Sequence, residues 1–189
     1  FIPNDNPFQD ASGAVLEEFW CIGLRSPHRM TYDPVSKTIW EGDVGQGARE
    51  EVNVIVKGGN YQWAYKEGRL DGPIKKPTVL IGKEVPPVHE YSHSRGETQF
   101  DGDNCVIGGY VYRGREHAEE LAGKYIFGDN GSGRIWALSL AGDGSVNVTQ
   151  IATMPAGFNY SGLSSFGIDH DNDLYLCQMG PSGKIYKLA

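Results

Sequence analysis

The chain has 189 residues, with 26 glycines, 10 prolines, 11% aromatic and 39% hydrophobic residues, which is enough material for one substantial core. Abundant glycine and aromatic residues without long helical periodicity favour an all-β fold with many turns. The net charge of −7 and the scattered lysines and arginines argue against nucleic-acid binding, because a protein that grips phosphates needs clustered basic side chains.

Alternating apolar residues between turn signals predict strands along most of the chain. In chain order the predicted strands are 14–23, 30–33, 38–43, 52–56, 107–113, 146–154 and 165–169, with strand–turn–strand units at 125–138 and 174–188. Only residues 116–121 have modest helical character. Residues from about 66 to 104 carry glycine, proline and charge without clear periodicity, so we expect a long excursion between sheets there.

Two of these units repeat one pattern. Residues 125–138 read YIFGDNGSGRIWAL and residues 174–188 read LYLCQMGPSGKIYKL, each with an apolar strand, a turn of small residues, Ser-Gly, a basic residue, isoleucine, an aromatic residue and leucine. The two Ser-Gly turns fall about 50 residues apart, a spacing typical of propeller blades. Small antiparallel sheets of this kind cannot bury both faces alone and stack around an axis, so the pattern predicts about three to four blades.

The most informative segment is 42–63, which reads GDVGQGAREEVNVIVKGGNYQW. A turn of small residues places backbone carbonyls at a loop surface, and Glu50 and Glu51 lead from it into an apolar strand. Tyr61 and Trp63 close the segment. Carboxylates, carbonyls and tight-turn glycines are what Ca²⁺ needs from a loop. Two strands joined by an ordinary turn are the alternative.

Residues 89–93 read HEYSH and match the zinc-protease pattern HExxH. That chemistry needs both histidines one turn apart on a helix. Two prolines precede the match and a glycine follows shortly after it, which favours an extended segment with exposed or hydrogen-bonded histidines.

The cysteines and the start of the sequence bear on disulfides and on the extent of the protein. Cys21, Cys105 and Cys177 lie far apart without the spacing of a zinc site, and they are compatible with three thiols or with one disulfide and one thiol. No apolar run is long enough to span a bilayer, and no signal peptide is recognisable. Residues 1–8 read as the middle of a surface loop, so we expect the sequence to begin inside a longer protein.

Four stretches in order resemble the glucose/sorbosone dehydrogenase family: GLRSPHRMTYDP at 23–34, the segment 42–63, GGYVYRG at 108–114, and 125–138. This family contains soluble quinoprotein sugar dehydrogenases and a hedgehog-interacting-protein-like branch. It has a six-bladed β-propeller fold, with pyrroloquinoline quinone (PQQ) and Ca²⁺ at one end of the axis. The resemblance implies that residues 1–189 form a single partial propeller domain, roughly the C-terminal half.

The chemistry implied by the resemblance is oxidation of a sugar hydroxyl. A histidine takes the hydroxyl proton, hydride passes to the quinone, and Ca²⁺ polarises the quinone carbonyls. That histidine belongs to an earlier blade, so no catalytic residue is assigned in this chain.

Candidate cofactor contacts come from the first matching stretch. Arg25 matches an arginine that reaches toward the cofactor, where a guanidinium can fork onto carboxylate or quinone oxygens. An ion pair at a blade edge is the alternative. Ser26 stands where the dehydrogenases usually carry asparagine, and His28 where they often carry glutamine. These changes are typical of the hedgehog-interacting-like branch.

Candidate calcium ligands come from the segment 42–63. Gly45 and Gln46 match a pair whose backbone carbonyls face the cofactor-bound calcium. Glu51 and Tyr61 match a second, structural calcium site of bacterial aldose dehydrogenases. For Glu51 the alternative is a salt bridge to a nearby arginine or lysine.

Other cofactor contacts of the family are absent from the sequence. The family places a lysine in the turn that is 129–132 here, and two arginines in the region that is 159–165 here, but neither stretch contains a cation. Because PQQ is a tricarboxylate, this loss weakens its electrostatic hold.

Two functions remain open. One is a PQQ- and calcium-dependent sugar (aldose) dehydrogenase, and the other is a calcium-binding propeller module that has lost the quinone. In either case we expect that the chain needs an N-terminal half of the ring or self-association, and that it is periplasmic or extracellular.

Overall fold

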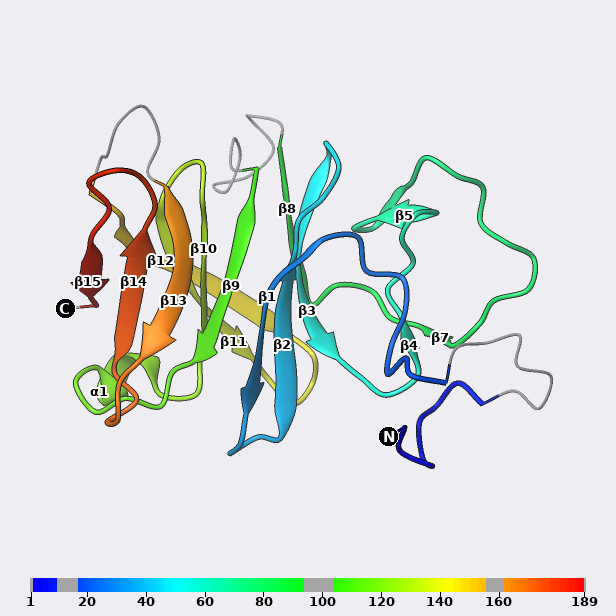
Figure 1. Cartoon of the computed structure of the whole chain (residues 1–189), viewed down its shortest axis with the longest axis horizontal. Helices are drawn as coiled ribbons and strands as arrows, with labels where there is room; N and C mark the ends of the chain where they lie inside the picture. The colour runs from blue at the N-terminus through cyan, green and yellow to red at the C-terminus, as the bar shows by residue number, and fades with distance from the viewer. Residues whose placement is uncertain (1, 10–16, 94–103, 156–161, 189) are drawn as a thin grey trace.

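The computed structural model describes residues 2–9, 17–93, 104–155 and 162–188, and within them the fold is almost entirely antiparallel β-sheet (Figure 1). The first sheet has the order β1–β2–β3–β8, formed by Pro27–Asp33, Thr38–Asp43, Arg49–Ile55 and His89–Ser92. The second consists of β9 to β12, which are Val106–Val111, Tyr125–Asp129, Arg134–Leu140 and Val146–Thr153. The third contains β13 to β15, which are Leu163–Ile168, Leu174–Gln178 and Ile185–Lys187.

The three sheets stand side by side as blades. The first strand of the second sheet, β9, contacts both β1 and β13, so the first strands of the three sheets lie together (Figure 1). The single described helix, α1 (Ala118–Leu121), lies in the connection between β9 and β10. This arrangement confirms the predicted all-β fold and a partial β-propeller.

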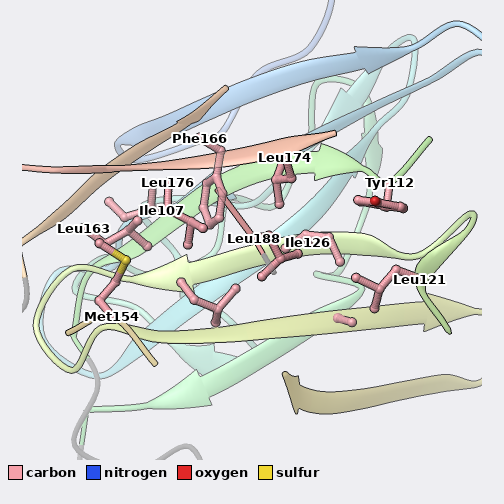
Figure 2. Packing of buried hydrophobic residues seen from close by; sticks show 12 residues of the cluster. Ile107, Tyr112, Leu121, Ile126, Met154, Leu163, Phe166, Leu174, Leu176 and Leu188 are labelled. Carbon is pink, nitrogen blue, oxygen red and sulfur yellow. The ribbon is translucent and has the colours of Figure 1, made fainter. Parts of the chain in front are cut away.

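Aromatic and aliphatic side chains fill the spaces between neighbouring blades. Between the first two sheets, Trp40 stacks on Tyr125 with ring centroids 4.5 Å apart and planes inclined by 16°. Between the second and third sheets, a separate cluster includes Ile107, Ile126 and Phe166 (Figure 2). The second blade is therefore covered by a blade on each face, and the first and third blades each pack one face against it, as stacking around an axis requires.

The segment between β3 and β8 extends beyond the first blade, on the side away from the second (Figure 1). It contains two small two-stranded sheets, in which β4 (Gly59–Asn60) pairs in parallel with β7 (Lys83–Glu84), and β5 (Lys66–Glu67) pairs with β6 (Leu70–Asp71). The stretch 66–104 thus contains short strands, and β8 at its described end completes the first blade.

Most predicted strands are confirmed, with one exception. Of the strand predicted at 14–23, the described residues 17–23 form only an isolated bridge between Ile22 and Asn60. Gly23 has a φ of +80°, and the segment is held by backbone bonds such as Tyr61 N–H to Ile22 O at 2.9 Å. Phe19 and Trp20 are 44% and 39% exposed, so the described part of the segment is a loop without a buried face, and the prediction of a regular strand was wrong there.

A buried ion pair joins the first and second blades. Asp33 at the end of β1 accepts hydrogen bonds from Nε and Nη2 of Arg113, at 3.1 and 2.6 Å, and its side chain is 2% exposed. The Arg113 guanidinium holds the pKa of Asp33 below its usual range.

Replacing Arg113→Met should lower the free energy of unfolding by about 3 kcal/mol, because it leaves the buried Asp33 carboxylate without its cation. The measurement is urea unfolding at neutral pH. The matched control is Arg115→Met, since the Arg115 side chain is 84% exposed and pairs with Asp171. That control should change stability by less than about 0.5 kcal/mol. Equal losses in the two variants would contradict a special role for the inter-blade pair.

Candidate functional site

The candidate site lies at the hairpin that joins β2 to β3. The last cross-strand pair of this hairpin is Asp43 opposite Glu51, and residues 44–48 form the loop. Asp43 is buried and accepts the backbone N–H groups of Arg25 and Ser26, at 2.8 and 2.6 Å. The structure therefore brings two cofactor candidates beside the candidate calcium loop.

Arg25 also contacts the hairpin through its side chain. Its Nη1 donates to the carbonyl of Val44 at 2.9 Å, and its guanidinium lies 5.4 Å from the ring centre of Trp63. His28 lies in β1, half-buried, where the pairing of β1 with β2 is irregular between Pro27 and Met30.

Two carboxylates hold the loop by its amides. The N–H of Gly45 donates to Oε1 of Glu50 at 3.2 Å. The next four N–H groups, those of Gln46, Gly47, Ala48 and Arg49, all donate to Oε1 of Glu67 in β5, at 2.8, 2.8, 2.7 and 3.1 Å. Partial burial raises the pKa of Glu67, but these amide bonds outweigh it and the net pKa lies below its usual value.

The backbone of the loop has no room for a side chain at its first glycine. A Cβ atom at Gly45 would lie 1.7 Å from the carbonyl oxygen of Arg49, whereas one at Gly47 would meet nothing within 4 Å. Among the described residues, no hydrogen bond ends on the carbonyl oxygens of Gly45 or Gln46. These two oxygens are therefore available as ligands.

A second polar group lies on one face of β2 and β3. Glu41 is directly opposite Asn53, just as Asp43 is opposite Glu51, and residues two apart on a strand share a face. All four side chains are buried, Glu41 and Asn53 completely. The amide of Asn53 donates to both glutamates at 3.3 Å, and Glu51 also accepts the N–H of Gly68 at 2.6 Å.

These hydrogen bonds do not satisfy every buried oxygen. In the described part of the chain, Oε1 of Glu41 and Oδ1 of Asn53 have no hydrogen-bond partner. Burial and the charge of Asp43 raise the pKa of Glu41 to about 9, and burial raises that of Glu51 to about 7. Buried acceptors in this state need either protons or a cation.

A calcium ion could pair with these buried oxygens only if carboxylate, amide and carbonyl oxygens bind it together. Within the described ranges, no group of three or more histidine, cysteine or acidic side chains is placed to hold a metal by itself. Calcium accepts amide and carbonyl oxygens as well as carboxylates, so the free oxygens of Glu41 and Asn53 suit it.

The Tyr61 hydroxyl is already engaged elsewhere. It donates to the carbonyl of Val54 at 2.6 Å and accepts the N–H of Val56 at 2.9 Å, at the far end of β3 from Glu51. Burial raises its pKa to about 12. Its carbonyl oxygen, which accepts no hydrogen bond among the described residues, is the atom left for a metal.

The HExxH match lies in a strand, as the sequence indicates. His89 is in β8, and His93, just beyond it, pairs through Nε2 with Oε1 of Glu50 at 2.6 Å. Glu50 also accepts the N–H of Val106 at 2.8 Å, so this pair links the first and second blades. An extended backbone separates the α-carbons of residues four apart by about 13 Å, which is too far for the two histidines to share one zinc ion as they do one turn apart on a helix.

The resemblance assigns cationic cofactor contacts to two further stretches, the turn 129–132 and the region 159–165. The turn 129–132 is closed by bonds to Asp129, such as that from the N–H of Ser132 at 2.9 Å. Neither this turn nor residues 162–165 contain lysine or arginine. This part of the chain does not fit a tricarboxylate cofactor as well as the hairpin fits calcium.

Sequence reasoning missed three residues of the site: Glu41, Asn53 and Glu67. A signal existed for the first two, because Glu41 is two residues from Asp43 and Asn53 is two residues from Glu51, a spacing that puts each polar pair on one face of a strand. Their meeting depends on the register of the hairpin, which the sequence alone does not fix.

Comparisons with known proteins identify the family. The Glucose / Sorbosone dehydrogenase family profile matches residues 1–187, and the chain belongs to this family. It is 34% identical over 198 residues to the HIPL1 protein of Arabidopsis thaliana, covering 93% of the chain and 28% of the plant protein. A stretch of 90 residues is 42% identical to the aldose sugar dehydrogenase YliI of Escherichia coli (strain K12), covering 45% of the chain and 24% of that protein.

Comparison with solved structures also finds a sugar dehydrogenase fold. The soluble aldose sugar dehydrogenase of Escherichia coli, in its apo-form, matches 100% of the chain with a TM-score of 0.71 and 25% identity. The chain spans 51% of that structure. No helix among the residues described is long and apolar enough to cross a membrane.

Replacing Glu41→Gln should remove part of the pH dependence of stability when calcium is chelated. In the folded protein burial and the charge of Asp43 raise the pKa of Glu41 to about 9, whereas in the unfolded chain its pKa is the ordinary 4.5 of a glutamate. The folded state then binds more protons between these values, so stability falls as pH rises through this window, by up to about 1.4 kcal/mol per pH unit.

The measurement is the free energy of unfolding from pH 5 to 9 with a chelator. As pH rises, the free energy of unfolding of Glu41→Gln should increase relative to that of the wild type. The exposed control Glu119→Gln should show the same pH dependence as the wild type. Parallel curves for wild type and Glu41→Gln would show that Glu41 is not the buried proton acceptor.

Proposed function

We propose that this chain is part of a PQQ- and calcium-dependent dehydrogenase that oxidises a hydroxyl of an aldose or related sugar. Membership of the Glucose / Sorbosone dehydrogenase family and the similarity to an aldose sugar dehydrogenase support the reaction class. The observation that carries the calcium part is the hairpin loop whose amides are all engaged and whose Gly45 and Gln46 carbonyls are free.

In this proposal the chain holds two calcium ions and lines one side of the cofactor position. The carbonyls of Gly45 and Gln46 hold a calcium ion, which when bound acts as a Lewis acid toward oxygens of the cofactor. Arg25 and Ser26, fixed by Asp43, line the same end of the blade. A second calcium is held by Glu51, with the free oxygens of Glu41 and Asn53 and the carbonyl of Tyr61 as further ligands.

The same features allow a second function, a calcium-binding propeller module without a quinone. The absence of lysine and arginine from 129–132 and from 162–165 favours it, as does the similarity to a HIPL protein over most of the chain. Both proposals share the calcium sites and differ only in the cofactor.

Adding PQQ and Ca²⁺ to the full-length protein and measuring dye reduction with aldoses separates the two. The dehydrogenase should bind PQQ in a titration and reduce the dye with at least one aldose. Calcium binding without PQQ binding would leave only the module, and absence of both would sink both proposals.

The proposal includes a compartment and a partner. We place the protein in the periplasm or outside the cell, by analogy with the family. Since the chain spans about half of the solved aldose sugar dehydrogenase, the remaining blades or a second copy must cover its outer blades.

Replacing Gly45→Ala should weaken calcium binding by more than tenfold, because the new Cβ must displace the carbonyl of Arg49 and distort the loop. Gly47→Ala is the matched control, since it adds the same methyl group to the same loop where nothing lies within 4 Å. Isothermal titration with CaCl₂ on the full-length protein is the measurement. Unchanged affinity in Gly45→Ala would exclude the loop as a calcium ligand.

A further inference from the structure

We infer that Glu67 is the positioning residue of the calcium loop, turning the carbonyls of Gly45 and Gln46 outward by capturing the amides on the opposite side of the same peptide groups. This inference rests on the proposed function, because it concerns the loop assigned there to calcium. It is carried by four N–H groups that converge on one oxygen of Glu67.

The geometry of the peptide group links the two sides. In a trans peptide the N–H of one residue points opposite to the C=O of the residue before it. The peptide bonds of this loop are trans, since the cis bonds are His28–Arg29 and Trp63–Ala64. When the N–H groups of Gln46 and Gly47 point at Glu67, the carbonyls of Gly45 and Gln46 must therefore point away from it.

The position of Glu67 is itself fixed. Glu67 lies in β5, which pairs with β6, and the side chain is largely buried. The next residue, Gly68, donates its N–H to Glu51 at 2.6 Å, and its φ of +59° suits glycine. A Cβ there would lie 2.3 Å from Oε2 of Glu90. One turn thus connects the loop to Glu51, which belongs to the second proposed calcium site.

Charge supports the same role. The free N–H groups of a tight loop form a concave site that attracts anions. Glu67 fills that site with a carboxylate of the protein itself, so the loop does not need an external anion to keep its shape. Hydrogen bonds to an ionised acceptor are also stronger than neutral ones, which suits a loop with little apolar surface.

The test compares wild type, Glu67→Ala and Glu67→Gln in the full-length protein with two readouts. Amide hydrogen exchange of residues 46–49 without calcium reports the capture of the N–H groups. Titration with CaCl₂ reports the consequence for the metal. We expect Glu67→Ala to lose exchange protection in the loop and to bind calcium roughly 10–100-fold more weakly. Glu67→Gln, which keeps an acceptor oxygen but no charge, should fall between the two.

Acetate provides a readout that a general loss of stability would not show. Added acetate should restore both loop protection and calcium affinity in Glu67→Ala, because it can occupy the vacated amides, and should not affect the wild type. The control is Glu84→Ala. It removes a carboxylate of β7 that pairs with Lys76 and lies outside the loop, so this variant should bind calcium like the wild type.

The outcomes separate the inference from the proposed function. Unchanged exchange at 46–49 in Glu67→Ala, or lost protection with unchanged calcium affinity, would overturn the inference. A wild type that binds no calcium, whatever its exchange data, would instead overturn the proposed function.

Discussion

Carboxylates that accept backbone N–H groups hold the loops of this molecule to its strands. Asp43 accepts the amides of Arg25 and Ser26, and Glu67 accepts those of residues 46–49. Such loops consist of glycine and polar residues and have little apolar surface to bury. Bonds to a charged acceptor are the stronger kind available to them, so they decide the shape of the blade ends.

Carboxylates in and beside the first blade are in two different situations: Glu67 lies in the small β5–β6 sheet, and Glu41 lies in β2 of the blade. Glu67 receives four amides and keeps its charge, since its net pKa is lowered. Glu41 is fully buried with one unpartnered oxygen, and burial beside Asp43 raises its pKa. The number of acidic residues therefore does not locate a cation site. A shortage of hydrogen-bond donors is more informative: among the described carboxylates, Glu41 has a buried oxygen without a partner, which a cation would supply.

The sequence predicted those parts of the blades in which the paired strands are adjacent in the chain. The unit at 125–138 was predicted because two adjacent strands and their turn lie within one short stretch, and the structure places β10 and β11 there. The strand β8 was not predicted as part of the first blade, because its four residues join β3 from a stretch without periodicity. The strand at 14–23 was predicted from apolar content, which an exposed loop can share, as Phe19 and Trp20 show.

The site was less accessible to sequence reasoning for the same physical reason. Gly45, Gln46 and Glu51 could be named because they lie in one continuous segment. The contact of Glu41 with Asn53 requires the register of a hairpin, and the contact of Glu67 with the loop spans about twenty residues. Residues that act by holding another segment leave no local pattern, so only the folded structure identifies them.

The placement of Arg25 shows how one fold can serve two functions. Its guanidinium donates to Val44 and lies over Trp63, so it stabilises the β2–β3 hairpin without any cofactor. A quinone carboxylate that recruited Arg25 would have to replace these contacts with stronger ones, and the neighbouring blades supply no cation in 129–132 or 162–165 to help. The loop that we assign to calcium is held by Glu67 of the β5–β6 sheet, whose contacts with the loop do not involve Arg25. Under the proposal, separate groups of residues hold the calcium and the quinone, so loss of the quinone would leave the calcium contacts in place.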